Sequence, residues 1–226
     1  MRFVLVHGAY HGAWCWGRLV PELEQLGHDV VALDLPIGDP AAGASEYAAL
    51  MDEVVAGQDT VVVGHSMMGL AIPLVRQAGH LVFLCAFVPN PGESFNQQRA
   101  RDRIEPEYEL TTSEFVDQGD GVWMIGRGTA KELFYHDASP EAADWAVAQL
   151  RPQAYRIMKE VTPLTEWPQI EYTSIICRDD HAVNPVWARR VARERLGVEA
   201  IEMDGGHSPF LTRPEELAAV LDLAAG

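Results

Sequence analysis

Short, continuous apolar runs recur along the chain, and most of them are followed by a segment that is predicted to be helical. Uninterrupted runs of this kind are typical of parallel strands that are buried on both faces. Six such runs alternating with helices predict an α/β fold built on a six-stranded, mainly parallel, doubly wound sheet. The expected strands are residues 3–6, 28–33, 60–63, 81–87, 173–177 and 199–203.

Helices between the first four strands are predicted from apolar spacing and from capping residues. Apolar positions over 14–26 predict a helix, in which Pro21 either introduces a kink or marks the regular start. Ser45 is expected to cap the next helix, which runs to about residue 56. A third helix is expected directly after Ser66, and Pro73 should bend or shorten it.

Two further helices are predicted after the fifth and sixth strands. Asn184 is expected as the N-cap of the first, with Pro185 at its first helical position. Thr212 and Glu215 have the spacing of a capping box for the last helix. These helices continue the β–α alternation, so the carboxyl-terminal part of the chain is expected to belong to the same sheet.

The alternation is interrupted between residues 93 and 167. Charged clusters alternate there with Gly-rich and aromatic patches. An insertion of this size between regular β–α units is most often a lid over the carboxyl edge of the sheet. We therefore expect a core of residues 1–92 and 168–226 and a helical lid of residues 93–167 inserted after the fourth strand. Four apolar residues are expected either to line a pocket under the lid or to form its core: Trp123, Met124, Phe134 and Tyr135.

Composition narrows the class of protein. With 226 residues, 48% of them hydrophobic and 22% charged, the chain has the composition of a single globular α/β enzyme. A net charge of −16 argues against nucleic acid and anionic membrane surfaces as partners. The three cysteines have no CxxC spacing, and the apolar run at residues 3–6 is too short for a signal peptide or a membrane span. A cytoplasmic protein is expected.

A serine lies where the third strand ends. Residues 60–70 read Thr-Val-Val-Val-Gly-His-Ser-Met-Met-Gly-Leu, so Ser66 stands between a buried strand and a helix-compatible segment. This is the strand–turn–helix context of a nucleophile elbow, where the start of a helix helps to stabilise an oxyanion. The usual pattern is Gly-x-Ser-x-Gly, but Met68 replaces the second glycine, which follows at Gly69. We expect a local adjustment that houses Met68.

A serine nucleophile needs a base, and the base needs a group that orients it. His207 follows the sixth strand, and Asp179 and Asp180 follow the fifth. Taking Ser66, Asp180 and His207 gives the chain order Ser…Asp…His, which is the order of α/β-hydrolases. Each residue lies at the carboxyl end of a parallel strand, so the three can converge on one edge of the sheet. Asp179 competes with Asp180 for the role of the acid.

The oxyanion hole is expected to consist of backbone N–H groups. One belongs to Met67, directly after the serine, and the other to Ala9 or Tyr10 in the loop after the first strand. Asp34, in an Asp-Leu-Pro sequence, is expected to cap its own loop. The chain has no His-Glu-x-x-His motif and no Cys/His cluster, so neither a metal nor a cofactor is expected.

Four segments carry a family resemblance: His-Gly-Ala-Tyr-His-Gly-Ala-Trp-x-Trp at 7–16, Ala-Leu-Asp-Leu-Pro at 32–36, Leu-Phe-Tyr-His-Asp at 133–137 and Gly-His-Ser-Pro-Phe at 206–210. With them the chain resembles the plant methylesterase and hydroxynitrile lyase-like family and its bacterial esterase relatives, from residue 3 to about 220. The resemblance implies the α/β-hydrolase fold with a helical cap. By its register, the acid falls on Asp180 and the first oxyanion donor on Ala9.

Two chemistries occur in the family that the chain resembles. The lyases carry a threonine at the position of Gly8 and a lysine directly after the catalytic histidine, where this chain has Ser208. Without that cation to receive cyanide, hydrolysis is favoured. We therefore predict a cofactor-independent carboxylesterase that cleaves small carboxylic esters through a Ser-His-Asp triad and an acyl-enzyme.

Two alternatives remain open at this point. One is a hydroxynitrile lyase or C–C bond-cleaving relative that uses the same triad. The other is a small-molecule-binding protein of low turnover on the hydrolase scaffold, because fold alone does not fix function. The expected partner is a small-molecule ester, and a homodimer is a candidate assembly.

Overall fold

The main sheet has six parallel strands, as predicted. The structure is a computed structural model that describes residues 1–102, 104 and 114–226. Within these ranges the strand order is β2-β1-β3-β4-β8-β9, so β3 lies in the interior of the sheet. The strands are β1 Arg2–Val6, β2 Asp29–Leu33, β3 Thr60–His65, β4 His80–Leu84, β8 Glu171–Cys177 and β9 Ile201–Met203.

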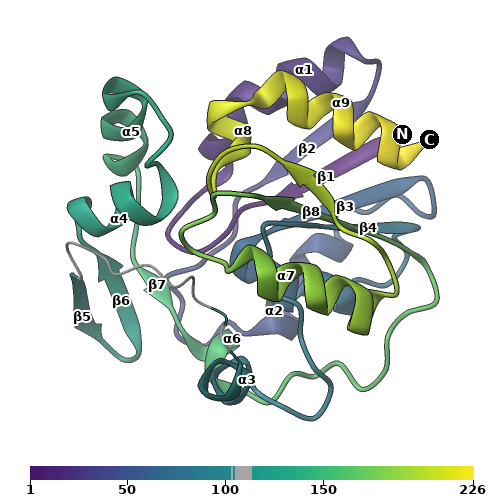
Figure 1. Cartoon of the computed structure of the whole chain (residues 1–226). Helices are drawn as coiled ribbons and strands as arrows, with labels where there is room; N and C mark the ends of the chain where they lie inside the picture. The colour runs from purple at the N-terminus through teal and green to yellow at the C-terminus, as the bar shows by residue number, and fades with distance from the viewer. Residues whose placement is uncertain (103, 105–113) are drawn as a thin grey trace.

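Helices cover both faces of this sheet (Figure 1). Helices α1 and α9 lie on one face, and α2 and α7 lie on the other. Alternate residues of β1 enter the two apolar cores: Phe3 and Leu5 pack on the α1 side, and Val4 and Val6 pack on the α2 side. Burial on both faces explains the continuous apolar runs. These helices are α1 Leu19–Gln25, α2 Ala44–Asp52, α7 Pro185–Val191, followed by a π-helical turn Ala192–Leu196, α8 Pro209–Thr212 and α9 Pro214–Ala225.

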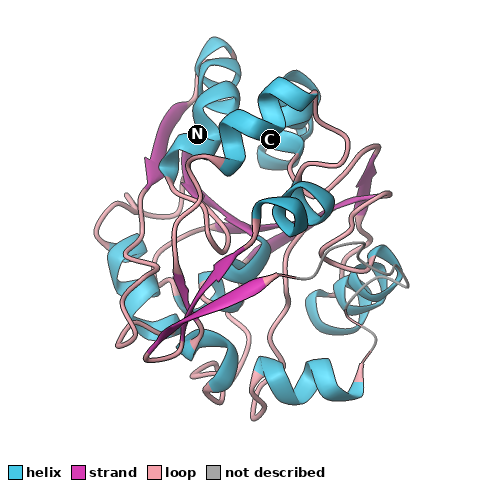
Figure 2. Ribbon diagram, turned by 90° about the vertical axis from the view of Figure 1, so that its left-hand side faces the viewer, coloured by secondary structure: helices cyan, strands magenta, loops and turns pink. Residues whose placement is uncertain are grey.

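Residues 93–167, called the insertion from here on, contain strands as well as helices. Figure 2 views the molecule from the side on which the insertion lies. A separate three-stranded sheet has the order β5-β6-β7, so the segment expected to be a helical lid combines helices with strands. Gly119, Asp120 and Gly121 all have positive φ, which lets the chain turn sharply between β5 and β6. The elements are α3 Phe95–Arg101, β5 Phe115–Gly119, β6 Val122–Ile125, α4 Arg127–Phe134, α5 Pro140–Val147, β7 Gln153–Ala154 and α6 Arg156–Lys159.

The division into core and lid at residues 92 and 168 stays a prediction. Residues 103 and 105–113 of the insertion, which include part of its charged clusters, lie outside the described residues. The described parts of the insertion contact the loops that follow β1 and β2 at the carboxyl edge of the sheet.

Two helix starts in the first half of the chain differ from the prediction. The segment 14–26 divides into a 3-10 turn, Ala13–Arg18, and the regular helix α1, which carries Pro21 in its first turn. Ser45 is not a cap, because α2 begins one residue earlier. The Gly43 N–H donates to the Glu46 carboxylate at 2.8 Å, and the Ala44 N–H donates to Glu160 of the insertion at 2.7 Å. Carboxylates thus replace the serine hydroxyl at this helix start.

The segment after Ser66 is not an α-helix, contrary to the prediction. It forms two short 3-10 turns, Ser66–Leu70 and Ile72–Leu74. Pro73 has no N–H to donate, so the ladder of helical hydrogen bonds cannot continue through it.

Of the two helix starts predicted in the last third of the chain, one is correct. Asn184 accepts hydrogen bonds from the Val186 and Trp187 N–H groups and caps α7 as expected. Thr212 and Glu215 form no capping box, because Thr212 donates its hydroxyl to Asp137 of the insertion instead.

Candidate active site

The turn after β3 holds Ser66 in an unusual backbone conformation. Its φ is 55°, in the left-handed region that costs a non-glycine residue roughly 1–2 kcal/mol. The Ser66 carbonyl accepts a hydrogen bond from the Phe87 N–H at 3.0 Å. A Cβ on Gly69 would overlap the Phe87 carbonyl oxygen, so the elbow and the chain after β4 are in direct backbone contact. The turn therefore cannot relax without moving the next strand.

Met68 is housed as part of the core. Its side chain is fully buried among the apolar residues on the α2 side of the sheet. The close approach that a glycine usually provides here comes from its neighbours: Gly69 packs on Phe87, and a Cβ on Gly64 would collide with the side chain of Ile72. The departure from the usual elbow pattern is therefore a change in core packing. Methionine can make this change because its flexible side chain fills irregular gaps in a core.

The loops after β8 and β9 bring a carboxylate and an imidazole to the serine. The distance from His207 Nε2 to Ser66 Oγ is 3.0 Å, and the distances from His207 Nδ1 to the two Asp180 carboxylate oxygens are 3.0 and 2.9 Å. A carboxylate only accepts, so Nδ1 carries the proton and Nε2 presents a lone pair to the hydroxyl. All three residues are buried, Ser66 being 7% exposed. The geometry is that of a nucleophile, its base and the acid that orients the base.

Asp180, and not Asp179, faces the histidine. One Asp180 oxygen also accepts the N–H groups of Ala182 and Val183, at 2.7 and 2.9 Å. Hydrogen bonds from these N–H groups fix the orientation of the carboxylate. Asp179 is exposed and uses its backbone, whose N–H donates to the Gly205 carbonyl at 3.1 Å. That bond ties the acid loop to the loop of His207.

Two further histidines beside the site are held neutral. His65 Nε2 donates to the His207 carbonyl at 2.9 Å, and His11 Nδ1 donates to the Ala9 carbonyl at 2.7 Å. Burial lowers the pKa of His11 to about 3 and holds the pKa of His65 well below its usual range. These rings therefore shape the loops around His207 without placing a second cation beside it.

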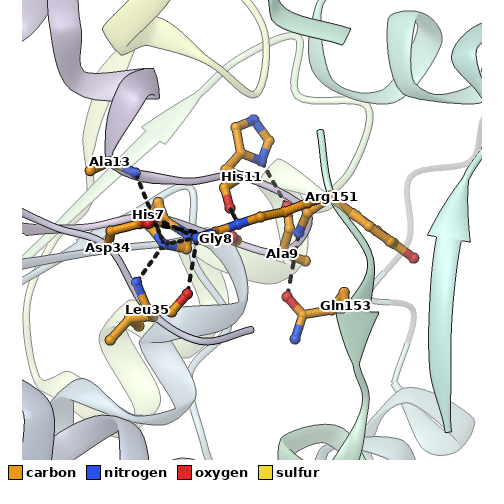
Figure 3. Close-up of polar contacts among 10 residues, drawn as sticks. His7, Gly8, Ala9, His11, Ala13, Asp34, Leu35, Arg151 and Gln153 are labelled. Carbon is orange, nitrogen blue, oxygen red and sulfur yellow. Dashed lines mark hydrogen bonds and ion pairs between the residues drawn. The ribbon is translucent and has the colours of Figure 1, made fainter. Parts of the chain in front are cut away.

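The loop after β1 offers the predicted second oxyanion donor. A Cβ on Gly8 would lie 2.8 Å from the Ser66 Cβ, so this loop touches the elbow. The Tyr10 N–H points at Gln153 Oε1 at 3.4 Å, whereas no described residue accepts from the Ala9 N–H. Met67 lies in the first turn after Ser66, where helical segments leave N–H groups unpaired. Figure 3 shows the polar contacts around this loop.

Comparison with known proteins shows the family of the chain. A model of the alpha/beta hydrolase family matches residues 3–220. The chain belongs to the alpha/beta hydrolase family. It is 30% identical to salicylic acid-binding protein 2 of Nicotiana tabacum, with 97% of this chain and 95% of that protein covered. It is also 30% identical to esterase PIR7B of Oryza sativa subsp. japonica, with 97% and 93% covered.

A solved structure has the same fold. The crystal structure of polyneuridine aldehyde esterase superposes with a TM-score of 0.81 at 23% identity, covering 99% of this chain and 98% of that one. At this identity the likeness concerns the fold, and it covers the parallel sheet and the segments between its strands alike.

Sequence reasoning gave no role to two charged residues of this alpha/beta hydrolase that lie in the insertion. Asp137 accepts the Gly206 N–H at 2.9 Å, next to His207, and it also pairs with Arg213 at 3.0 Å. Arg151 reaches the loop that carries Ala9. Asp137 ends one of the segments that carried the family resemblance, but no pattern in the sequence distinguishes Arg151 from other surface arginines.

The four apolar residues predicted to lie near a pocket or in the core of the lid have different environments. Phe134, at the end of α4, lies with its ring 5.5 Å from the His207 ring at an interplanar angle of 30°. Tyr135 is buried and its hydroxyl bonds His11 Nε2 at 2.7 Å, so it belongs to the core. Trp123 and Met124 lie half-buried on β6.

Asp34 caps the segment after the first strand and not the loop in which it lies. One of its carboxylate oxygens accepts the Ala13 N–H at 3.1 Å, where the first 3-10 turn begins.

The described residues contain neither a cluster of metal ligands nor a helix that could span a membrane. Across residues 1–102, 104 and 114–226, no three His, Cys, Asp or Glu side chains gather as metal ligands would. The independence from cofactors stays a prediction. None of the helices in these ranges combines the length and the apolar character needed to cross a bilayer.

Proposed function

We propose that this alpha/beta hydrolase is a carboxylesterase that cleaves small carboxylic esters through an acyl-enzyme on Ser66. The observation that carries the proposal is the continuous hydrogen-bonded chain from Asp180 through His207 to Ser66. The name of the rice relative, esterase PIR7B, supports the same reaction class.

In the acylation half, Ser66 Oγ attacks the ester carbonyl while His207 Nε2 takes its proton. The imidazolium that forms is stabilised by the Asp180 carboxylate. The negative charge that develops on the carbonyl oxygen is met by the Ala9 and Met67 N–H groups. His207 then gives the proton to the departing alcohol, which leaves the acyl group on Ser66.

In the deacylation half, His207 acts as a general base once more. It removes a proton from water, which attacks the acyl carbon, and the same two N–H groups hold the second oxyanion. Ser66 receives the proton as the carboxylic acid departs. Each group that acts in one half-reaction acts in reverse in the other, so the site requires no further titratable group.

Two observations disfavour the lyase alternative. A side chain at Gly8 would collide with Ser66 and His65, so the threonine of the lyases does not fit this loop. The position after His207 holds Ser208, which is fully buried, in place of a lysine that could receive cyanide. Hydrolysis needs neither group.

The insertion is proposed to act as a lid on this site. The support is that the Phe134 ring lies beside the His207 ring and that Asp137 accepts the N–H of Gly206, directly before His207. The three cysteines are buried and unpaired, which supports the cytoplasmic location expected from the sequence. The homodimer stays a prediction, and a small-molecule ester is the proposed partner.

Turnover of p-nitrophenyl acetate and butyrate by the wild type and by Ser66→Ala tests the proposal. We expect multiple turnovers by the wild type and none above background by the variant. Cyanide release from mandelonitrile without ester turnover would indicate the lyase instead. Tight binding of small carboxylic acids without any turnover would indicate the binding protein.

A further inference from the structure

We infer that Arg151, in the insertion, is a positioning residue for the oxyanion donor at Ala9. The inference rests on the proposed function, because it assigns Arg151 a role only if Ala9 meets an oxyanion. Arg151 lies more than 130 residues from Ala9 in the sequence, yet its contacts surround the loop of Ala9 (Figure 3).

The backbone conformation of Tyr10, directly after Ala9, requires support from residues outside this loop. Its φ of 65° is in the left-handed region, which is unfavourable for an aromatic residue and persists only where the surroundings enforce it. All three of its polar groups bond to the segment 151–155 of the insertion. The Tyr10 carbonyl accepts the Arg151 N–H at 2.9 Å, its N–H points at Gln153 Oε1, and its hydroxyl bonds the Tyr155 hydroxyl at 2.5 Å.

The Arg151 side chain contacts both the loop of Ala9 and the neighbouring loop that follows β2. Nε donates to the His11 carbonyl at 2.9 Å, and Nη2 donates to the Leu35 carbonyl at 2.9 Å. The guanidinium also pairs with Asp34. That ion pair is partly exposed and contributes little stability by itself, so the geometry of the two carbonyl contacts matters more.

A chain of hydrogen bonds leads from Arg151 to the peptide group that carries the Ala9 N–H. Arg151 fixes Leu35, whose own N–H donates to His7 Nε2 at 3.1 Å. An N–H group can only donate, so His7 Nε2 is unprotonated and the proton is on Nδ1. His7 Nδ1 then donates to the Gly8 carbonyl at 3.0 Å. Because Gly8 C=O and Ala9 N–H belong to one peptide group, this bond orients and polarises the proposed oxyanion donor.

This arrangement predicts an effect on the transition state and not on the ground state. An oxyanion donor gains most of its interaction energy when charge develops on the carbonyl oxygen. Loosening the donor should therefore lower kcat and leave KM nearly unchanged. A residue that only stabilised the fold would lower the fraction of active protein instead.

The test compares Arg151→Met with Arg127→Met, both in the purified full-length protein. Arg127 is a matched control because it lies in the same insertion and also pairs with an aspartate, Asp144, away from the site. For Arg151→Met we expect kcat on p-nitrophenyl butyrate to fall about 10- to 50-fold with KM within about twofold, less than the loss of a whole oxyanion donor. Inhibition by a trifluoromethyl ketone, which forms an oxyanion on Ser66, should weaken by a similar factor, and Arg127→Met should resemble the wild type.

Further results decide whether Arg151 positions the donor at Ala9 or only stabilises the fold. In Arg151→Ala, millimolar guanidinium should restore part of kcat and equal sodium chloride should not. Equal kcat in Arg151→Met and Arg127→Met, or a loss explained wholly by unfolded protein in near-UV circular dichroism, would overturn the inference. If Arg151→Met does not fold, Asp34→Asn should show the same kcat-specific loss at smaller size, and an unchanged kcat there would overturn the inference. A wild type without ester turnover would contradict the proposed function itself, whatever Arg151 does.

Discussion

The two sides of the candidate site are held in place by different forces. The elbow around Ser66 is built from buried apolar residues and from glycines in backbone contact, all between β3 and the chain after β4. The loop of Ala9 is held by hydrogen bonds to the insertion, and an ion pair between Arg151 and Asp34 ties the insertion to the neighbouring loop after β2. The elbow should therefore respond to changes of volume, and the loop to changes of charge and hydrogen bonding.

The largest effect is expected at His207, the base that faces Ser66. Asp180→Asn keeps the shape of the acid but offers an N–H group or a neutral oxygen to His207, so the tautomer that faces Ser66 is lost. We expect kcat to fall about 10⁴-fold, as for other triads of this kind. Ester turnover with the thermal midpoint as control measures this. Activity within tenfold of the wild type would mean that Asp180 is not the acid.

Gly8→Ala tests the contact between loop and elbow. The new methyl group would lie 2.8 Å from both Ser66 Cβ and His65 Nδ1, so the loop must move away from the serine. We expect kcat to fall about 10²- to 10³-fold, comparable to losing one oxyanion donor. Gly17→Ala is the matched control, because a Cβ there meets nothing within 4 Å. Equal kcat in both variants would show that the loop does not need this close approach.

Met68→Gly restores the usual elbow pattern and tests whether core packing holds this side. Removing a fully buried methionine leaves a cavity, so the free energy of unfolding should fall by about 3–5 kcal/mol, while kcat per folded molecule stays within about threefold. Met68→Leu conserves volume and should cost less than about 1.5 kcal/mol. Urea denaturation measures both. A stable Met68→Gly protein with raised kcat would mean that Met68 restrains the site.

The smallest effect concerns the neutral histidines beside the loop. Burial holds the pKa of His11 at about 3, whereas the unfolded chain titrates near 6.5. Only the unfolded state then binds this proton, so stability is complete above pH 6.5 and falls as the pH drops toward 3, by about 1.4 kcal/mol per pH unit for one group. His11→Gln should reduce this slope by that amount in urea titrations between pH 7.5 and 4.5. An unchanged slope would show that His11 is not the group responsible.

The local features of the elbow side could be predicted from the sequence, whereas the contacts between the insertion and the Ala9 loop could not. The strands and the approach of His207 to Ser66 could be predicted, because continuous apolar runs and their following loops are local features and parallel strands bring their carboxyl ends together. The family resemblance assigned the acid to Asp180 and one oxyanion donor to Ala9. The helix after Ser66 was wrongly predicted because Pro73 and the close backbone contacts at Gly69 favour 3-10 turns, which apolar spacing does not reveal.

The contacts made by the insertion could not be predicted. Asp137 and Arg151 act on loops that are distant in sequence, and a single charged residue on a helix or loop usually faces solvent. The same holds for Glu160, which takes part in capping α2 in the place expected for Ser45. Tertiary polar contacts of this kind leave no periodic pattern in the chain.

Covalent labelling of the nucleophile tests the central claim most directly. An organophosphonate that mimics the tetrahedral intermediate would be incubated with the wild type and with Ser66→Ala, and the adduct located by peptide mass spectrometry. We predict one adduct per chain, on Ser66, with ester turnover lost in proportion to labelling and no adduct in the variant. An adduct on another residue, or full ester turnover by protein labelled at Ser66, would contradict the assignment of Ser66 as the nucleophile.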